Sequence, residues 1–249
     1  MNSSGTAVII LAAGKGKRMK SDLPKVLHLL RGKPLINWVI SAVESMMPAR
    51  IIAVVGHKAE EVERSLSGGN ILFARQEEQL GTGHAVAQAI GLLSDFSGDV
   101  FVLCGDVPLI KTETLREMLD IHRRNKSAVT LLSVIMQNPA GYGRILRDSR
   151  GSVIANVEEK CATESEKGIR EINGGIYVFD SSFLIDSIGK ISSDNAQGEY
   201  FLPDLIKIAV DRGLSVSSLT LDNYLQLVGV NRNEDLKLLE DMLAERVEV

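Results

Sequence analysis

The residues best suited to chemistry lie in one stretch near the start of the chain. An apolar run over 7–11 is followed at once by small residues and a dense set of cations, namely Ala12, Ala13, Gly14, Lys15, Gly16, Lys17, Arg18, Lys20 and Lys25. Small residues let the backbone approach a phosphate chain, and glycine can adopt the positive φ angles that turn N–H groups toward an anion. The stretch therefore predicts an anion cradle. A solvated basic loop between a strand and a helix is the alternative.

Two familiar phosphate loops do not match this stretch. A P-loop requires G-x-x-x-x-G-K-[ST], and the dinucleotide fingerprint requires a third glycine where Met19 stands. Pro24 also interrupts the segment before a helix could follow directly. Any nucleotide site here must be of another kind.

Two further segments follow expected strands. Asp106 lies in the turn that follows the strand expected at 100–103, and carboxyl ends of parallel strands border the crevice where such sheets bind ligands. Mg²⁺ takes few carboxylates together with phosphate oxygens, so Asp106 is a candidate ligand, although a lone aspartate in such a turn is often structural. Gly81 and Gly83 flank Thr82 before the helix expected at 83–93. On local physics alone, that segment is a simple turn in which Thr82 caps the expected helix.

The composition is typical of a globular protein that is not built around nucleic acid. Of the 249 residues, 45% are hydrophobic and 24% charged, and the net charge is −4, so a nucleotide site must be locally basic. Cys104 and Cys161 cannot form a disulfide framework or a zinc site by spacing. We expect reduced thiols in a cytoplasmic protein, with no signal peptide and no membrane span.

Apolar strands alternate with helices through the first half of the chain. We expect strands at 7–11, 51–55, 71–74, 100–103 and 129–136, with helices between them and one from Thr112 to 124 that Thr112 caps. This alternation predicts an α/β fold with a Rossmann-like, mostly parallel sheet flanked by helices.

After residue 137 the elements become shorter. Strands are expected at 142–147, 153–158, 172–179, 216–219 and 226–230, and helices at 180–188 and 202–212. Asn233 is expected to cap a final amphipathic helix. Because neither a linker nor a repeat interrupts the pattern, we expect one domain over 1–249, with a β insertion in its second half.

The motifs in this chain resemble those of the sugar nucleotidyltransferases, which transfer a nucleotidyl group from a nucleoside triphosphate to a sugar phosphate. LAAGKGKRM followed by Pro24-Lys25 resembles their L-x-A-G-x-G-x-R-M signature and downstream Pro-Lys. Within the family, at least six motifs over 5–245 resemble the uridylyltransferase domain of bacterial bifunctional N-acetylglucosamine-1-phosphate uridylyltransferase/glucosamine-1-phosphate acetyltransferases. The resemblance implies that UTP and N-acetylglucosamine-1-phosphate give UDP-N-acetylglucosamine and pyrophosphate, a step of cell wall biosynthesis.

The resemblance also assigns the two halves and the nucleotide site. It implies a nucleotide-binding half at 5–136, a sugar-binding half at 137–230 and a C-terminal helix at 231–249. The segment Q-x-x-Q-L-G-T-G-H-A implies that Gln76 and the backbone of Gly81 and Thr82 read uracil, for which glutamine offers a donor and an acceptor. The first loop would bind the nucleotide through Leu11, Ala12, Ala13, Gly14 and Lys25.

The sugar pocket is implied by four further motifs. These are G-Y-G-R-I, Val157-Glu158, E-I-N-x-G and Q-G-E-Y, and they nominate Gly143, Glu158, Asn173 and Glu199, with the adjacent Glu159 as the alternative to Glu158. Two positions depart from the pattern, because Cys104 stands where a tyrosine is common and Pro203 where a threonine is common.

The metal and catalytic residues follow from the same resemblance. L-x-G-D-x-P-L and G-V-N imply that Asp106 and Asn231 bind Mg²⁺, although Asn231 could instead cap the last helix. The sugar phosphate would attack the α-phosphorus of UTP in line, without a general base, while Arg18 and Lys25 stabilise the developing charge. The four histidines have no assigned role: His28, His57, His84 and His122.

Two other functions remain as alternatives. One is transfer to another sugar-1-phosphate or from another nucleotide. The other is a catalytically silent, nucleotide-binding regulatory protein. The sequence disfavours it, because it retains both cations and both metal-binding residues, which are Arg18, Lys25, Asp106 and Asn231. The resemblance stops before the β-helix of hexapeptide repeats with which such relatives continue and form trimers. It thus implies a monomer or weak homodimer. The net charge of −4 and the lack of a long apolar run lead us to expect no nucleic-acid or membrane partner.

Overall fold

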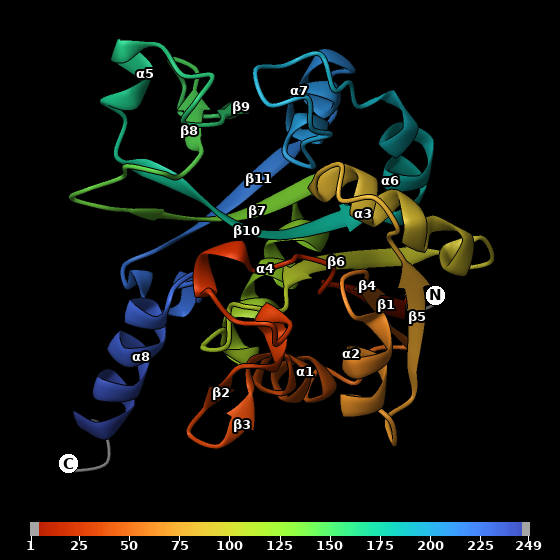
Figure 1. The fold of residues 1–249 in the computed structure, drawn as a ribbon. Helices are drawn as coiled ribbons and strands as arrows, with labels where there is room; N and C mark the ends of the chain where they lie inside the picture. Colours follow the sequence, from red (N-terminus) through yellow and green to blue (C-terminus); the bar gives the residue numbers. More distant parts are fainter. Residues whose placement is uncertain (1–4, 246–249) are drawn as a thin grey trace.

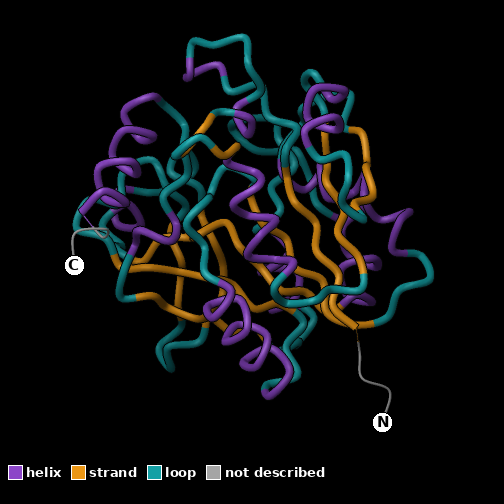
Figure 2. Tube along the Cα trace, turned by 90° about the horizontal axis from the view of Figure 1, so that it is seen from below, coloured by secondary structure: helices purple, strands orange, loops and turns teal. Residues whose placement is uncertain are grey.

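The computed structural model describes residues 5–245, apart from the side chains of Lys17 and Glu245. Two expectations therefore lie outside what the structure describes. They are the contribution of the Lys17 side chain to the basic loop and residues 246–249 of the helix expected at 231–249. In Figures 1 and 2, the start of β1 and the end of α8 lie on opposite sides of the molecule.

A twisted sheet forms the centre of the fold. Seven strands lie in the order β11-β7-β10-β6-β1-β4-β5. Their bounds are β1 Gly5–Leu11, β4 Arg50–Val55, β5 Ile71–Arg75, β6 Gly98–Cys104, β7 Val129–Ile135, β10 Glu171–Asp180 and β11 Val216–Leu221. Neighbours pair in parallel except on both sides of β10, which is antiparallel to β6 and β7. The expectation of a mostly parallel α/β sheet is thus confirmed.

Helices cover both faces of the sheet (Figure 1). The eight helices of the described chain are α1 Leu35–Glu44, α2 Ala59–Ser65, α3 Thr82–Ala89, α4 Thr112–Arg124, α5 Glu164–Lys167, α6 Ser181–Ser187, α7 Asp204–Asp211 and α8 Asn233–Glu245. Along β1, Ala7 and Ile9 pack with α3, α6 and α7, whereas Val8 and Ile10 pack with α1, α2 and α4. Because successive side chains of a strand point to opposite faces, a continuous apolar run is what a two-sided core requires.

The β insertion is smaller than the whole second half. Strands β8 (Arg144–Arg147) and β9 (Val153–Val157) form an antiparallel hairpin, which joins the main sheet where Arg144 of β8 pairs with Ile172 of β10. Strands β10 and β11 belong to the main sheet itself. The chain therefore leaves the sheet after β7, builds the hairpin and returns through the sheet centre.

A third apolar cluster joins the last helix to the loop that follows β1. Leu239 of α8 and Val230 pack against Met19 and against Leu30 of the small hairpin β2 (Leu29–Leu30) and β3 (Lys33–Pro34). Each large apolar side chain buried in this way contributes about 1.5–3 kcal/mol. This packing holds α8 next to the first loop.

Three expected helix caps are wrong. The N-cap of α3 is Gly81, and Thr82 Oγ1 accepts from the backbone N–H of Leu202 at 3.1 Å. Thr112 is the first residue of α4, and its hydroxyl donates to the carbonyl of Ala42 at 2.9 Å. Both hydroxyls are used by tertiary partners that local sequence cannot reveal.

The start of the last helix also differs from the expectation. Asn233 is the first residue of α8 rather than its cap, while Asp235 accepts from the backbone N–H groups of Asn231 and Arg232 at 2.8 Å each. The strand expected at 226–230 is wrong as well. Tyr224–Leu227 form a 3-10 turn, whose start is fixed by the Asn223 side chain accepting from the N–H of Leu225.

Candidate active site

The first loop is held by backbone hydrogen bonds at the carboxyl end of β1. Ala12 donates to the carbonyl of Val54 at 2.8 Å, and Gly105 donates to the carbonyl of Leu11 at 2.9 Å. The loop therefore shares the edge of the sheet where β4 and β6 also end. This is the position expected for a ligand site in a parallel sheet.

Gly16 is required by its backbone conformation and by its contact with Lys25. Its φ is +60°, and a Cβ there would lie 2.8 Å from the Cβ of Lys25. A larger residue would push the Lys25 segment away from the loop. Gly14 does not have a positive φ, and a Cβ there would meet no atom within 4 Å.

Four side chains from three distant parts of the sequence converge beside this loop. Lys25 Nζ forms an ion pair with Asp106 Oδ2 and donates to Asn231 Oδ1 at 3.1 Å. Arg18 Nη2 donates to the same Asn231 oxygen at 2.8 Å. The predicted catalytic cations and the predicted metal ligands therefore occupy one place.

Backbone contacts explain why Asn231 reaches Asp106. The N–H of Val230 donates to the carbonyl of Asp106 at 2.9 Å, so the two segments lie side by side. The side chain of Asn231 is oriented by its own Nδ2, which donates to the carbonyl of Gly229 at 3.3 Å. Asn231 does not cap α8 with this side chain, since its Oδ1 receives both cations.

A cavity of about 320 Å³ opens next to this cluster. It is lined by the predicted nucleotide residues Leu11, Ala12, Ala13, Gly14, Lys25, Gln76, Gly81 and Thr82, and also by Asp106, Cys104 and Glu199. Arg18 and Asn231 do not line it in the described part of the chain. They adjoin Lys25, because Asn231 Oδ1 accepts from both Lys25 and Arg18.

Gln76 is almost completely buried at the wall of this cavity, with 3% of its surface exposed. Its Nε2 donates to the carbonyl of Gly81 at 3.1 Å and lies 3.0 Å from Nδ1 of His84. Gly81 has φ +113°, and a Cβ there would meet the carbonyl oxygen of Tyr200 at 2.5 Å. Only glycine lets the 80–82 turn dock against this backbone.

A second cavity, of about 360 Å³, adjoins the first and contains the predicted sugar residues Gly143, Glu158, Asn173 and Glu199. The two cavities share four lining residues, which are Leu11, Thr82, Cys104 and Glu199. Cys104 thus stands at their junction, and burial raises the pKa of its thiol to about 12, which keeps it neutral. Together the two cavities form one continuous, two-part site.

Several residues that position the second cavity were not anticipated. Asn156 Nδ2 donates to Glu158 Oε1 at 2.9 Å, and both side chains crowd Gly143, where a Cβ would meet Asn156 Oδ1 at 2.5 Å. Asn156 and Glu158 are two residues apart around the end of a strand, so the alternation of side chains could have identified this pair. Burial raises the pKa of Glu158, and the nearby charge of Glu199 adds to this effect.

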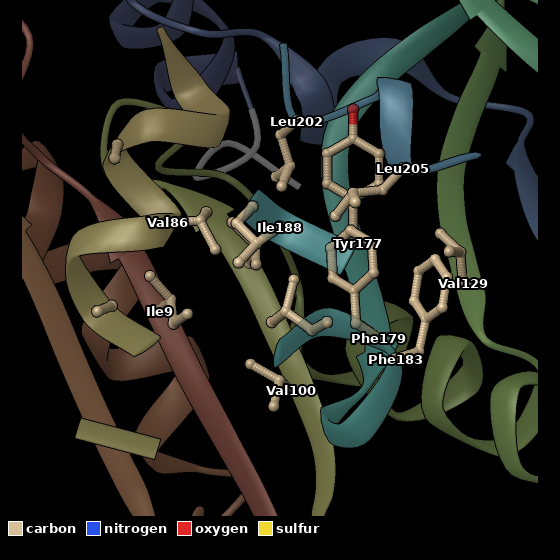
Figure 3. Packing of buried hydrophobic residues seen from close by; sticks show 14 of the residues in the cluster. Ile9, Val86, Val100, Val129, Tyr177, Phe179, Phe183, Ile188, Leu202 and Leu205 are labelled. Atoms are coloured by element: carbon tan, nitrogen blue, oxygen red, sulfur yellow. The ribbon is translucent and has the colours of Figure 1, made fainter. Parts of the chain in front are cut away.

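Tyr177 is a second unanticipated member of this cavity. Its ring stacks on Phe179 inside the core at a centroid distance of 5.6 Å, and Figure 3 shows its hydroxyl at the end of the ring remote from Phe179. Asn173 Nδ2 donates to that hydroxyl, and Asn173 Oδ1 accepts from the N–H of Gly175 at 3.0 Å. Burial raises the pKa of Tyr177, so the phenol stays protonated.

A further cavity of about 480 Å³ lies at the opposite end of the strands and contains none of the predicted site residues. Its polar groups mostly satisfy one another. Arg123 donates to Asp99 at 2.7 Å, and the buried His122 lies 2.9 Å from the hydroxyl of Thr130. Burial lowers the pKa of His122, which is consistent with a neutral core histidine.

Fold and site together define a nucleotidyltransferase, and comparison with known proteins agrees. The chain matches the Nucleotidyl transferase family over residues 7–226 and belongs to that family. It is 48% identical over 231 residues to the "Bifunctional protein GlmU" of Geobacter metallireducens, covering 92% of this chain and 48% of that protein. The protein of the same name from Geobacter sulfurreducens is 50% identical over 226 residues, covering 90% and 48%.

The chain spans about half the length of the curated relatives it matches. In fold, it is similar to the crystal structure of a putative glucose-1-phosphate thymidylyltransferase from Bacillus anthracis. The TM-score is 0.76, with 17% sequence identity and coverage of 95% of this chain and 94% of that one. The family expected from the motifs and the expected fold class are therefore both confirmed.

In the described residues, no helix is long and apolar enough to cross a membrane.

Proposed function

We propose that the chain is a uridylyltransferase that forms UDP-N-acetylglucosamine and pyrophosphate from UTP and N-acetylglucosamine-1-phosphate. The observation that carries this proposal is the continuous pair of cavities, with Lys25 and Asp106 on the nucleotide side of their junction. The family membership and the identity of 48–50% with the GlmU proteins support the same reaction.

In this proposal the first cavity holds the nucleotide. The backbone of 11–14 approaches the phosphates, Lys25 neutralises them, and Gln76 with Gly81 and Thr82 reads uracil. The orientation of the Gln76 amide refines this assignment. Because its Nε2 is committed to Gly81 and His84, its Oε1 is the atom left to accept from the N3–H of uracil.

The second cavity then holds the sugar. Glu158 and Glu199 would accept hydrogen bonds from sugar hydroxyls, Asn173 would contact the N-acetyl group, and the backbone of Gly143 would close one side. Because two carboxyl groups, an amide and a backbone segment line this cavity, it suits a ligand with many hydroxyl groups better than an apolar one.

The chemistry requires positioning and charge stabilisation rather than proton transfer. The phosphate of the acceptor is already an anion near pH 7, so it can attack the α-phosphorus of UTP in line as pyrophosphate leaves. Arg18 and Lys25 hold the phosphates and stabilise the charge that develops around the α-phosphorus. Each of these cations should contribute a factor of about 10²–10³ in rate, as single electrostatic donors do elsewhere.

The donor set fits a Mg²⁺ ion bound by Asp106 and Asn231. In the structure, oxygens of both side chains already converge on one cation, the ammonium group of Lys25. The described residues contain no group of three or more acidic, histidine or cysteine side chains that could hold a metal, which agrees with an ion that takes its remaining ligands from substrate phosphates. When bound, Mg²⁺ would neutralise phosphate charge and favour the departure of pyrophosphate.

We also propose a single catalytic domain in which 5–136 binds the nucleotide and 137–230 binds the sugar. The position of β10 supports this organisation, because this second-half strand lies between β6 and β7 of the first half, so the two halves share one sheet. We expect a cytoplasmic monomer or weak homodimer.

The decisive experiment measures pyrophosphate release with Mg²⁺. UTP, CTP, ATP, dTTP and GTP are each combined with N-acetylglucosamine-1-phosphate, glucosamine-1-phosphate and glucose-1-phosphate. The proposal expects the highest kcat/KM for UTP with N-acetylglucosamine-1-phosphate. A clear preference for another pair would assign a different nucleotidyl transfer, and absence of release with every pair would contradict a catalytic role.

A further inference from the structure

His84 lies beside the proposed base pocket, although it takes no part in the mechanism above. It is half-buried in α3, and its ring stands between two glutamine side chains. Nδ1 is 3.0 Å from Nε2 of Gln76, and Nε2 of the ring is 3.1 Å from Nε2 of Gln88. A neutral imidazole has one N–H donor and one acceptor nitrogen, so its neighbours decide which nitrogen carries the hydrogen.

The carbonyl oxygen of Gly81 determines whether Nδ1 of His84 carries the ring hydrogen. The Gln76 atom that faces His84 also lies 3.1 Å from this carbonyl, which can only accept. That atom must therefore be the amide nitrogen, because the amide oxygen could not donate to the carbonyl. Its second hydrogen points to Nδ1 of His84, so Nδ1 must be the acceptor and the ring hydrogen must lie on Nε2.

The two glutamines differ in their freedom to adapt to this arrangement. Gln88 is exposed, and its amide contacts both Nε2 of His84 and the backbone carbonyl of His84 at 3.2 Å. Because it is exposed, the Gln88 side chain can leave the carbonyl of His84 and place its oxygen where it accepts from the Nε2–H. Gln76 is 3% exposed, and its Nε2 is held by both the Gly81 carbonyl and Nδ1 of His84, so its amide keeps one orientation while both contacts are present.

This chain of contacts leaves one polar atom of Gln76 for a ligand. Its Oε1 makes no hydrogen bond within the part of the chain that the structure describes, and the residue lines the first cavity. The cavity therefore presents an acceptor at this point. Uracil offers a ring N–H at N3, whereas N3 of cytosine is an acceptor and would be repelled.

We propose that His84 is a positioning residue for base selection. It holds the Gln76 amide in the orientation that presents only oxygen to the base. Loss of the Nδ1 acceptor removes one of the two contacts that hold the amide nitrogen, so the amide can turn its NH₂ group toward the pocket. That group opposes the N3–H of uracil and suits N3 of cytosine. The inference rests on the proposed uridylyl transfer, whose base preference it explains.

The first test is independent of activity. Long-range ¹H–¹⁵N correlation spectra of the ¹⁵N-labelled chain at pH 8.5, where an ordinary imidazole is neutral, report the tautomer of each histidine. His84 is expected to carry its hydrogen on Nε2, and assignment of the signal uses the His84→Leu variant. A hydrogen on Nδ1 overturns the proposal, whatever the enzyme does.

The second test compares UTP with CTP in the pyrophosphate assay. His84→Leu should lower the ratio of kcat/KM for UTP to that for CTP about tenfold, mainly through KM for UTP, while KM for the sugar phosphate stays near the wild-type value. His84→Asn keeps an acceptor at the position of Nδ1 and should remain within about twofold of the wild-type ratio. Gln88→Ala should do the same.

The outcomes of the second test separate the two proposals. An unchanged ratio in His84→Leu, or equal losses for both nucleotides, overturns the role of His84 while the uridylyl transfer stands. If the wild-type chain turns over no UTP, the proposed function fails, and the tautomer measurement still decides whether His84 orients Gln76.

Discussion

Removal of the Lys25 side chain tests the central arrangement of the site. Lys25 Nζ is the group on which the Asp106 carboxylate and the Asn231 oxygen converge, and it lines the nucleotide cavity. Lys25→Ala should lower kcat/KM by about 10²–10³, which corresponds to about 2.7–4 kcal/mol of transition-state stabilisation. Most of this loss should appear in kcat, because the charge that Lys25 offsets develops at the α-phosphorus during the reaction.

The same substitution should change stability much less. The Lys25 and Asp106 side chains are 18% and 14% exposed, so breaking their pair leaves a carboxylate that water can still reach. We expect a loss of about 1–2 kcal/mol in the free energy of unfolding, measured by urea denaturation. A folded variant with greatly reduced turnover would separate chemistry from folding.

A matched control is Lys207→Ala, which breaks the exposed pair with Asp211 on α7, where the side chains are 67% and 58% exposed. Its turnover should equal that of the wild type, and its stability should change by less than about 1 kcal/mol. Turnover of Lys25→Ala within threefold of the wild type, at saturating UTP and Mg²⁺, would refute the assigned role of Lys25.

Two further predictions concern stability. Gly81→Ala should destabilise the fold by more than about 1 kcal/mol and raise KM for UTP, because a Cβ would meet the backbone of Tyr200 at 2.5 Å and φ is +113°. The control is Gly91→Ala, which should be nearly neutral because a Cβ there meets nothing within 4 Å. Equal shifts in melting temperature for the two variants would contradict this prediction. Burial, assisted by the charge of Glu158, raises the pKa of Asp204 to about 6. The folded state thus binds more protons than the unfolded state between about pH 4 and 6, so the contribution of Asp204 to stability falls as pH rises through that window. Asp204→Asn should accordingly raise the melting temperature at pH 7.5 but hardly at pH 4, and a gain of the same size at both pH values would show that the carboxyl charge is not the cause.

Local patterns in the sequence were sufficient to predict most strands, the flanking helices and the type of sheet. Continuous apolar runs such as 7–11 can be satisfied only by a sheet covered on both faces, so β1 and the helices around it follow directly from composition and spacing. The small residues after β1 and Asp106 after β6 were likewise visible as candidates, since both follow strands that end at the same edge.

The expected helix caps were wrong where a side chain can form a hydrogen bond either locally or with a distant part of the chain. The hydroxyls of Thr82 and Thr112 each satisfy the local rule for a cap, yet each bonds instead to a backbone group far away in the sequence. Asn156 could have been identified from its place two residues before Glu158, with which it is hydrogen-bonded, whereas nothing local in the sequence marks Tyr177 as the partner of Asn173.

The sequence by itself determined which chemical groups this protein has available and the strands on which most of them lie. Only the tertiary structure decided that they meet. Arg18 and Asn231 are separated by 213 positions, and they come into contact because α8 packs its apolar face on the first hairpin while Val230 bonds to the backbone of Asp106. Likewise, β10 inserts antiparallel between β6 and β7, which brings Asn173 to the cavity that adjoins the nucleotide loop. Both arrangements result from burial of apolar surface and from pairing of backbone groups over long distances in the chain, which no short window of sequence contains.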